Sequence, residues 1–134
     1  MPSQVQHETQ AQRNETFFQS LDRTVSVNRE WIVTAAFYAA LHWIESYFDN
    51  RHRQHFTSHR DRNNAVMRFG LPIASEYLDL YWSSRQARYE LYRFTQPEVE
   101  DLIHRKYRHF EALDQALGRD RVEGSSNIAL TNEL

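Results

Sequence analysis

The chain has 134 residues, of which 40% are hydrophobic and 25% charged, a composition typical of one globular domain. Only three glycines and three prolines occur, too few for a turn-rich β fold, and the net charge of -2 restricts any nucleic-acid contact to a local patch. The absence of cysteine excludes disulfides, thiolate zinc sites and cysteine nucleophiles.

The amino-terminal sequence MPSQVQHETQ lacks a charged region followed by an apolar one, so it does not resemble a secretory signal. We therefore expect a cytoplasmic protein that does not associate with a membrane. Helical spacing of Ala11, Phe17, Phe18 and Leu21 then predicts a first helix over about residues 8–23.

A central helix is predicted over residues 29–48, with the sequence REWIVTAAFYAALHWIESYF. This stretch is apolar nearly all round, which is typical of a helix buried at the centre of a bundle. Residues 24–27 are expected to form the preceding turn, and Asn28 is the expected helix cap.

The next stretch, RHRQHFTSHRDR over residues 51–62, is rich in arginine and histidine. Ser58 followed by Asp61 fits a capping box, which predicts a loop over 51–57 and a short helix over 59–69.

Two further helices are predicted. The apolar pattern favours a helix over 73–94 with its core face ending at Leu91 and Phe94, and Thr95 with Glu98 forms a capping box for a helix reaching about residue 117. The predicted fold is an all-α, four- to five-helix up-and-down bundle over residues 1–118, followed by a carboxyl-terminal tail over 119–134.

Seven histidines raise the question of a metal site, but no His-Glu-x-x-His pattern occurs, so we expect neither a metal nor a cofactor. His42, in the central helix, is expected to be a buried and hydrogen-bonded histidine. No Gly-x-Ser-x-Gly elbow and no glycine-rich phosphate loop are present.

The basic stretch is the better candidate for a ligand site. Guanidinium groups hold phosphates by paired hydrogen bonds, and a helix start adds backbone N–H donors. The expected phosphate contacts in this stretch are Arg51, Arg53, His59, Arg60 and Arg62. The alternative is a solvated loop whose charges serve solubility.

A second candidate surface is the stripe of Leu78, Trp82, Arg85 and Tyr89, spaced by four, three and four residues. Arg85 and Tyr89 would contact a phosphate and a base, or Arg85 would pair with Glu45 or Glu90 instead. An aromatic stripe of this kind also suits a subunit contact.

These features resemble the HEPN family of helical bundles. The resemblance depends on the helix AAFYAALHWIESY, on Ser58-His59-Arg60-Asp61-Arg62 opening a short helix, and on Tyr77 to Glu90, where an arginine precedes an aromatic residue by one turn. It implies a bundle of four or five helices, often a homodimer, in a family with many metal-independent ribonucleases. It also implies possible antitoxin or nucleotidyltransferase partners in toxin–antitoxin systems, and members that only bind RNA or nucleotides.

Active members carry an arginine followed after four to six residues by a histidine, and no histidine follows Arg85 at that distance. Only Arg53 and His59 have this spacing. The leading hypothesis is therefore an RNA- or nucleotide-binding module with weak or absent ribonuclease activity. The alternatives are an active ribonuclease that uses His59 with Arg53 or Arg60, and a module that only mediates dimerisation.

Overall fold

A computed structural model describes residues 2–108 and 110. The described part of the chain is all-α and contains no strand, which confirms the predicted fold class. Its elements are α1 (Gln4–Gln19), α2 (Ser26–His52), α3 (His59–Arg68), α4 (Ala74–Tyr89), α5 (Gln96–Asp101) and the π-helical segment η1 (Leu102–Tyr107).

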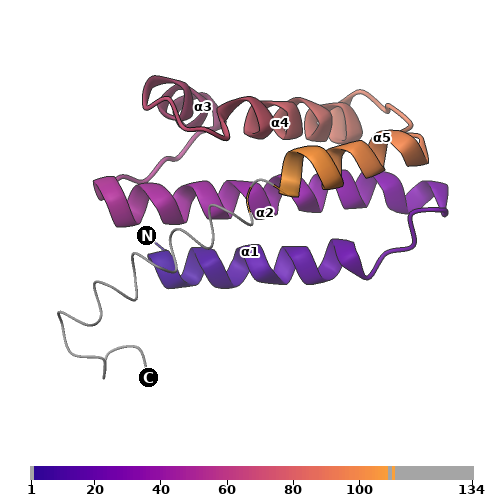
Figure 1. The fold of residues 1–134 in the computed structure, drawn as a ribbon, viewed down its shortest axis with the longest axis horizontal. Helices are drawn as coiled ribbons and strands as arrows, with labels where there is room; N and C mark the ends of the chain where they lie inside the picture. Colours follow the sequence, from indigo (N-terminus) through magenta and orange to yellow (C-terminus); the bar gives the residue numbers. More distant parts are fainter. Residues whose placement is uncertain (1, 109, 111–134) are drawn as a thin grey trace.

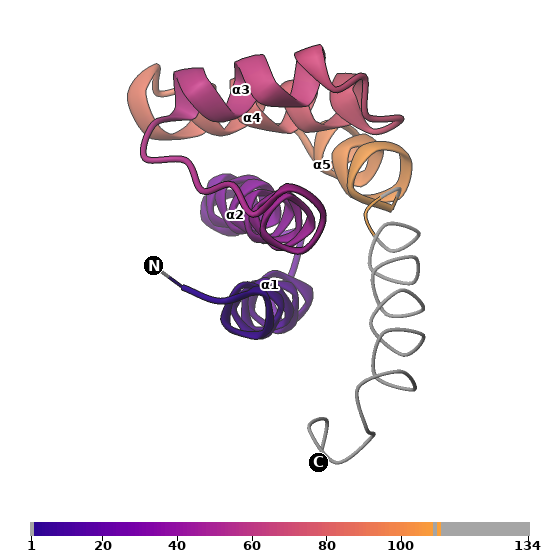
Figure 2. The same cartoon turned by 90° about the vertical axis from the view of Figure 1, so that its left-hand side faces the viewer.

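Helix α2 lies at the centre of the bundle. Helix α1 packs along one side of it, while α3, α4 and α5 cover the opposite side (Figure 1). Helices α1, α2, α4 and α5 alternate in direction along the long axis, and α3 crosses above α2 when the bundle is seen from its end (Figure 2). The up-and-down arrangement therefore brings α2 into contact with nearly every other element.

The burial of α2 follows from its composition. Side chains on several sides of the helix are fully buried, and the alanines among them allow neighbouring helices to approach closely. The fully buried residues of α2 are Ile32, Val33, Ala36, Phe37, Ala39, Ala40, Trp43, Ile44, Ser46 and Phe48. The predicted central helix is thus confirmed, although it is longer than predicted at both ends.

The cap predicted at Asn28 is wrong. Helix α2 begins at Ser26 with Val25 in the capping position, so Asn28 lies inside the first turn. Its side-chain amide donates to the carbonyl oxygen of Asp22, at 3.1 Å. Asn28 therefore ties the preceding turn to the helix and does not start it.

Helix α4 ends at Tyr89, earlier than the predicted 94. Leu91 adopts a φ of 56°, which a helix cannot contain, and its side chain is 86% exposed. The sequence places no glycine or proline there, so apolar spacing carries the predicted helix too far. Phe94 is buried as expected, but from the loop that follows.

Helix α5 starts as predicted, with a reciprocal capping box between Thr95 and Glu98. The chain then continues as η1, where the Tyr107 hydroxyl accepts the Trp43 indole N–H at 3.1 Å and contacts Glu15. These contacts join the end of the described chain to α1 and α2. The predicted cap at Gly118 and the tail over 119–134 lie outside the described residues.

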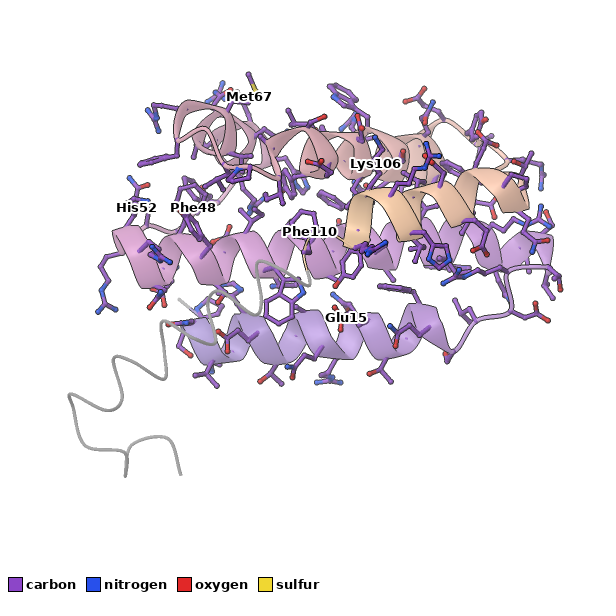
Figure 3. All side chains as sticks on the ribbon, in the orientation of Figure 1. Glu15, Phe48, His52, Met67, Lys106 and Phe110 are labelled. Carbon is purple, nitrogen blue, oxygen red and sulfur yellow. The ribbon has the colours of Figure 1, made fainter. Side chains whose placement is uncertain are left out.

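The side-chain view separates the interior from the surface (Figure 3). Phe48 and Phe110 point into the bundle and are fully buried, whereas Met67 points away from it and is 58% exposed. His52 lies at the end of α2, with its ring centroid 4.4 Å from that of Phe69. The contact between the His52 and Phe69 rings therefore packs the end of α3 against the last turn of α2.

Candidate nucleic-acid interface

The first residue of α3 is His59, and its position is fixed by both capping and packing. The Ser58 hydroxyl accepts the backbone N–H of Asp61 at 3.1 Å, which confirms the predicted helix start. The His59 ring centroid lies 5.7 Å from that of Phe37 on α2 and 5.5 Å from that of Tyr81 on α4. His59 therefore lies at the junction of three helices.

Arg62 does not belong to a ligand-binding surface, contrary to the sequence prediction. Its Nε lies 2.7 Å from Glu45 Oε1, and both side chains are less than one-tenth exposed. Its Nη2 also points to the carbonyl oxygen of Phe56, at 3.5 Å. Arg62 is thus the buried partner of a carboxylate, because α3 turns this residue towards α2.

The protonation of His59 follows from its contact with Arg62. Arg62 Nη1 lies 3.2 Å from His59 Nδ1, and a guanidinium only donates, so Nδ1 accepts and the ring proton is on Nε2. Burial lowers the pKa of His59, and the charges of Arg62, Arg88 and Arg85 lower it further. At pH 7 His59 is therefore neutral and presents an N–H donor.

Arg88 is a component of this region that the sequence reasoning missed. Its guanidinium donates to the hydroxyls of Tyr38 at 2.9 Å, Tyr89 at 3.2 Å and Ser84 at 2.9 Å. It also lies over the rings of Tyr89 and Tyr38, at 4.9 and 5.4 Å from their centroids. The sequence did contain a signal for Arg88. Arg85 and Arg88 are three residues apart, so they lie on the same face of a helix.

Arg85 is half-buried, and its guanidinium carbon lies 5.3 Å above the Tyr89 ring. Within residues 2–108 and 110, neither Arg85 nor Arg88 forms an ion pair with a carboxylate. The alternative pairings of Arg85 with Glu45 or Glu90 do not occur within the described residues, and Glu45 pairs with Arg62 instead. Two cations held by neutral groups therefore converge beside His59, and we call Arg85, Arg88 and His59 the cationic junction.

The other predicted arginines make contacts outside the cationic junction, although Arg60 is next to His59 in the chain. Arg51 packs over the Tyr47 ring at 5.7 Å, Arg53 caps the end of α2 with a φ of 52°, and Arg60 pairs with Asp61 at 3.5 Å. No hydrogen bond in the described structure joins Arg53 or Arg60 to His59. The candidate catalytic pairs are thus neighbours along the chain without direct contact.

A shallow hollow beside the cationic junction is lined by aromatic and amide side chains. Gln10 and Asn14 of α1 form one wall, while Trp31 and Tyr38 of α2 form another. Trp31 is 60% exposed, and Tyr38, which also lines the hollow, accepts a hydrogen bond from Arg88. Planar rings and amides next to a guanidinium suit a base and its phosphate.

His42 is hydrogen-bonded, as predicted, with its Nδ1 3.0 Å from Nδ1 of His7, but it is half-buried where full burial was predicted. Burial, together with the nearby His7 and Arg62, lowers the pKa of His42 to about 4. His7, Glu45 and His55 form a cluster close by in which a metal ion would find two imidazoles and a carboxylate.

Comparison with protein-family models, curated proteins and solved structures yields no match. None of the helices in the described residues is long and apolar enough to cross a bilayer.

Proposed function

We propose that the protein binds single-stranded RNA or a nucleotide through the cationic junction and the aromatic side chains around it. The supporting observation is that Arg85 and Arg88 lie together, held by aromatic rings and hydroxyls, with no carboxylate partner in the described structure. A phosphate would complete the hydrogen bonding of these two guanidinium groups.

The aromatic residues supply the second element of such a site. Tyr89 is 64% exposed beneath both guanidinium groups, and Trp31 is exposed at the neighbouring hollow. Exposed rings can stack on any base, and phosphate contacts carry no sequence information either. The proposed recognition is therefore of the nucleic-acid backbone and base planes, with little sequence preference.

The proposal includes membership of the HEPN-like bundles. An all-α bundle with a buried, alanine-rich central helix supports it, as does Arg85 with Tyr89 one turn later on α4. In this proposal Arg85 binds a phosphate, as the HEPN resemblance implies. Arg88 adds a second phosphate contact, which the resemblance does not imply.

A second candidate, a metal-independent ribonuclease, is favoured by the neutral state of His59 beside three arginines. A neutral imidazole with a free lone pair is the form that acts as a general base. The lone pair of His59 is occupied, however, because Nδ1 accepts from Arg62. His59 retains only a donor at Nε2, so we propose that ribonuclease activity is weak or absent.

Binding is tested by fluorescence anisotropy with a labelled single-stranded RNA at about 50 mM salt, where phosphate contacts are strongest. The double variant Arg85→Ala/Arg88→Ala is expected to bind at least about tenfold more weakly than the wild type, a loss of about 1.4 kcal/mol. Arg13→Ala is the matched control, because it removes an exposed arginine from α1.

Two results would overturn the proposal. One is no binding by the wild type at low salt, and the other is equal affinity of the double variant and the Arg13→Ala control. Circular dichroism of each variant shows whether the helices persist, so that a folding defect is not mistaken for lost binding.

A homodimer is also proposed, with Leu78 and Trp82 at the subunit contact. Trp82 is 59% exposed in the single chain, and Leu78 is half-buried one turn earlier. Exposed aromatic residues of this kind are enriched at the centres of interfaces. An antitoxin or a nucleotidyltransferase remains a proposed partner through the HEPN resemblance alone.

A further inference from the structure

We propose that His7, Glu45 and His55 form a binding site for a divalent transition-metal ion such as Zn²⁺. One nitrogen of each imidazole and one oxygen of the carboxylate lie within 4.8 Å of one another. The three residues come from α1, α2 and the loop between α2 and α3, so only the folded chain brings them together.

The hydrogen bonds of the two imidazoles leave one nitrogen of each ring free. His7 Nδ1 lies 3.0 Å from His42 Nδ1, which leaves Nε2 of His7 for a metal. His55 Nε2 lies 3.1 Å from Asp49 Oδ1, which leaves Nδ1. Metal-bound histidines commonly direct their second nitrogen to a carboxylate or another polar group, as both rings do here.

The second observation is an unsatisfied atom. His55 Nδ1 is buried and has no hydrogen-bond partner within the described residues. Buried polar atoms in folded proteins nearly always have a partner, so an orphaned imidazole nitrogen beside a second histidine and a glutamate calls for one. A metal ion would supply that partner.

Glu45 is already oriented for ligation. Its Oε1 accepts from Arg62 Nε at 2.7 Å, which fixes the carboxylate plane and leaves Oε2 for a ligand. The negative charges of Glu45 and Asp49 offset the arginine and part of the metal charge. Glu45 and His7 are 3% and 6% exposed, so water competes little for the site.

The donor set selects the class of metal. Two imidazoles and one carboxylate are the ligands of three-residue zinc sites, in which a fourth position is open to water or a substrate. A hollow lined by Pro2, Gln6, Gln10, His7 and His42 lies beside His7 on the surface. The sequence hides this site, because its three residues are far apart along the chain and form no spacing motif.

The test uses the full chain without an affinity tag, stripped of metal with a chelator. Co²⁺ is titrated in and followed by its visible absorption, and Zn²⁺ affinity is measured by competition with a chromophoric chelator. One metal ion per chain is expected. His55→Ala and His7→Gln are each expected to weaken Zn²⁺ binding by at least about 100-fold, since even the loss of a supporting residue costs about 10- to 100-fold.

His52→Ala is the matched control, because His52 is an exposed histidine three residues from His55 and lies outside the cluster. Its affinity should equal that of the wild type. The proposal is overturned by a wild-type chain that binds no metal, by unchanged affinity in His55→Ala, or by an equal loss in His52→Ala. If His7→Gln fails to fold, His55→Ala still tests the proposal, because His55 is only half-buried.

Discussion

Arg62 of α3 and Glu45 of α2 form a buried ion pair, with 2.7 Å between Nε and Oε1. The same guanidinium donates to His59, so the pair joins α2 to the start of α3 and fixes the tautomer of His59. Glu45 also belongs to the proposed metal cluster. One buried interaction thus orients parts of both candidate sites.

Arg62→Ala is expected to destabilise the fold by about 3–5 kcal/mol, because it leaves the Glu45 carboxylate buried without its counter-charge. Urea denaturation followed by circular dichroism measures this loss. The double variant Arg62→Met/Glu45→Leu should recover much of it, since an apolar pair leaves no charge unpaired. A loss below about 1 kcal/mol in the single variant would mean that the pair behaves like an exposed one.

Stability should fall as the pH drops below about 6.5, the ordinary pKa of histidine, and part of this fall should depend on His59. The folded environment lowers the pKa of His59 through burial and through Arg62, Arg88 and Arg85, so between the folded and unfolded pKa values the unfolded chain binds more protons. Stability therefore rises with pH through that window.

The measurement compares urea midpoints of the wild type and His59→Gln from pH 7.5 to pH 5, in the presence of a chelator. The variant should lose less stability on acidification. Other histidines with lowered pKa values, such as His42, titrate in both proteins, so only the difference between the two profiles reports on His59. Parallel profiles would show that His59 is as easily protonated in the fold as in the unfolded chain.

Local signals in the sequence were sufficient to predict the helical bundle. The apolar surround of α2 and the caps at Ser58 and Thr95 each act within a few residues, and all three are confirmed. The end of α4 was not predictable, because the backbone reverses at Leu91 without a glycine or proline.

The site was harder to predict because charge alone does not say which way a side chain points. Arg62 and Arg60 are two residues apart on α3, yet the first is buried against Glu45 and the second is exposed. The bond of Arg88 to Ser84, one turn earlier on α4, is local, but its bond to Tyr38 joins two helices and was missed. Pairings of this kind depend on tertiary packing.

Ser58→Ala should destabilise the protein by about 1 kcal/mol, the usual value of a lost helix cap. The hydroxyl accepts the Asp61 N–H, and no other group described in the structure satisfies that donor. Ser58→Asp, which also caps helices, should retain most of the stability. Equal urea midpoints for the wild type and Ser58→Ala would show that the start of α3 is held by packing alone.

Tyr89→Ala should weaken RNA binding by about 1–3 kcal/mol, the usual contribution of one stacked base. The salt dependence should remain unchanged, because no phosphate contact is lost. Tyr89→Phe keeps the ring and loses only the hydroxyl contact to Arg88, so it should bind nearly as well as the wild type. Anisotropy titrations over a salt series separate the two effects, and a reduced salt slope in Tyr89→Ala would contradict a stacking role.

Trp82→Glu should convert the proposed homodimer into a monomer. A charge placed at the centre of an apolar contact must be desolvated when the subunits associate, and such burial is costly without a partner. Val27→Glu is the control, because Val27 is also exposed, at 66%, but lies in the first turn of α2 and not on α4. Sedimentation equilibrium over a range of concentrations measures the mass. Selective loss of the dimer in Trp82→Glu would assign the subunit contact to the exposed face of α4. Dimers of equal strength in both variants would place the contact elsewhere. A monomeric wild type would show that there is no homodimer.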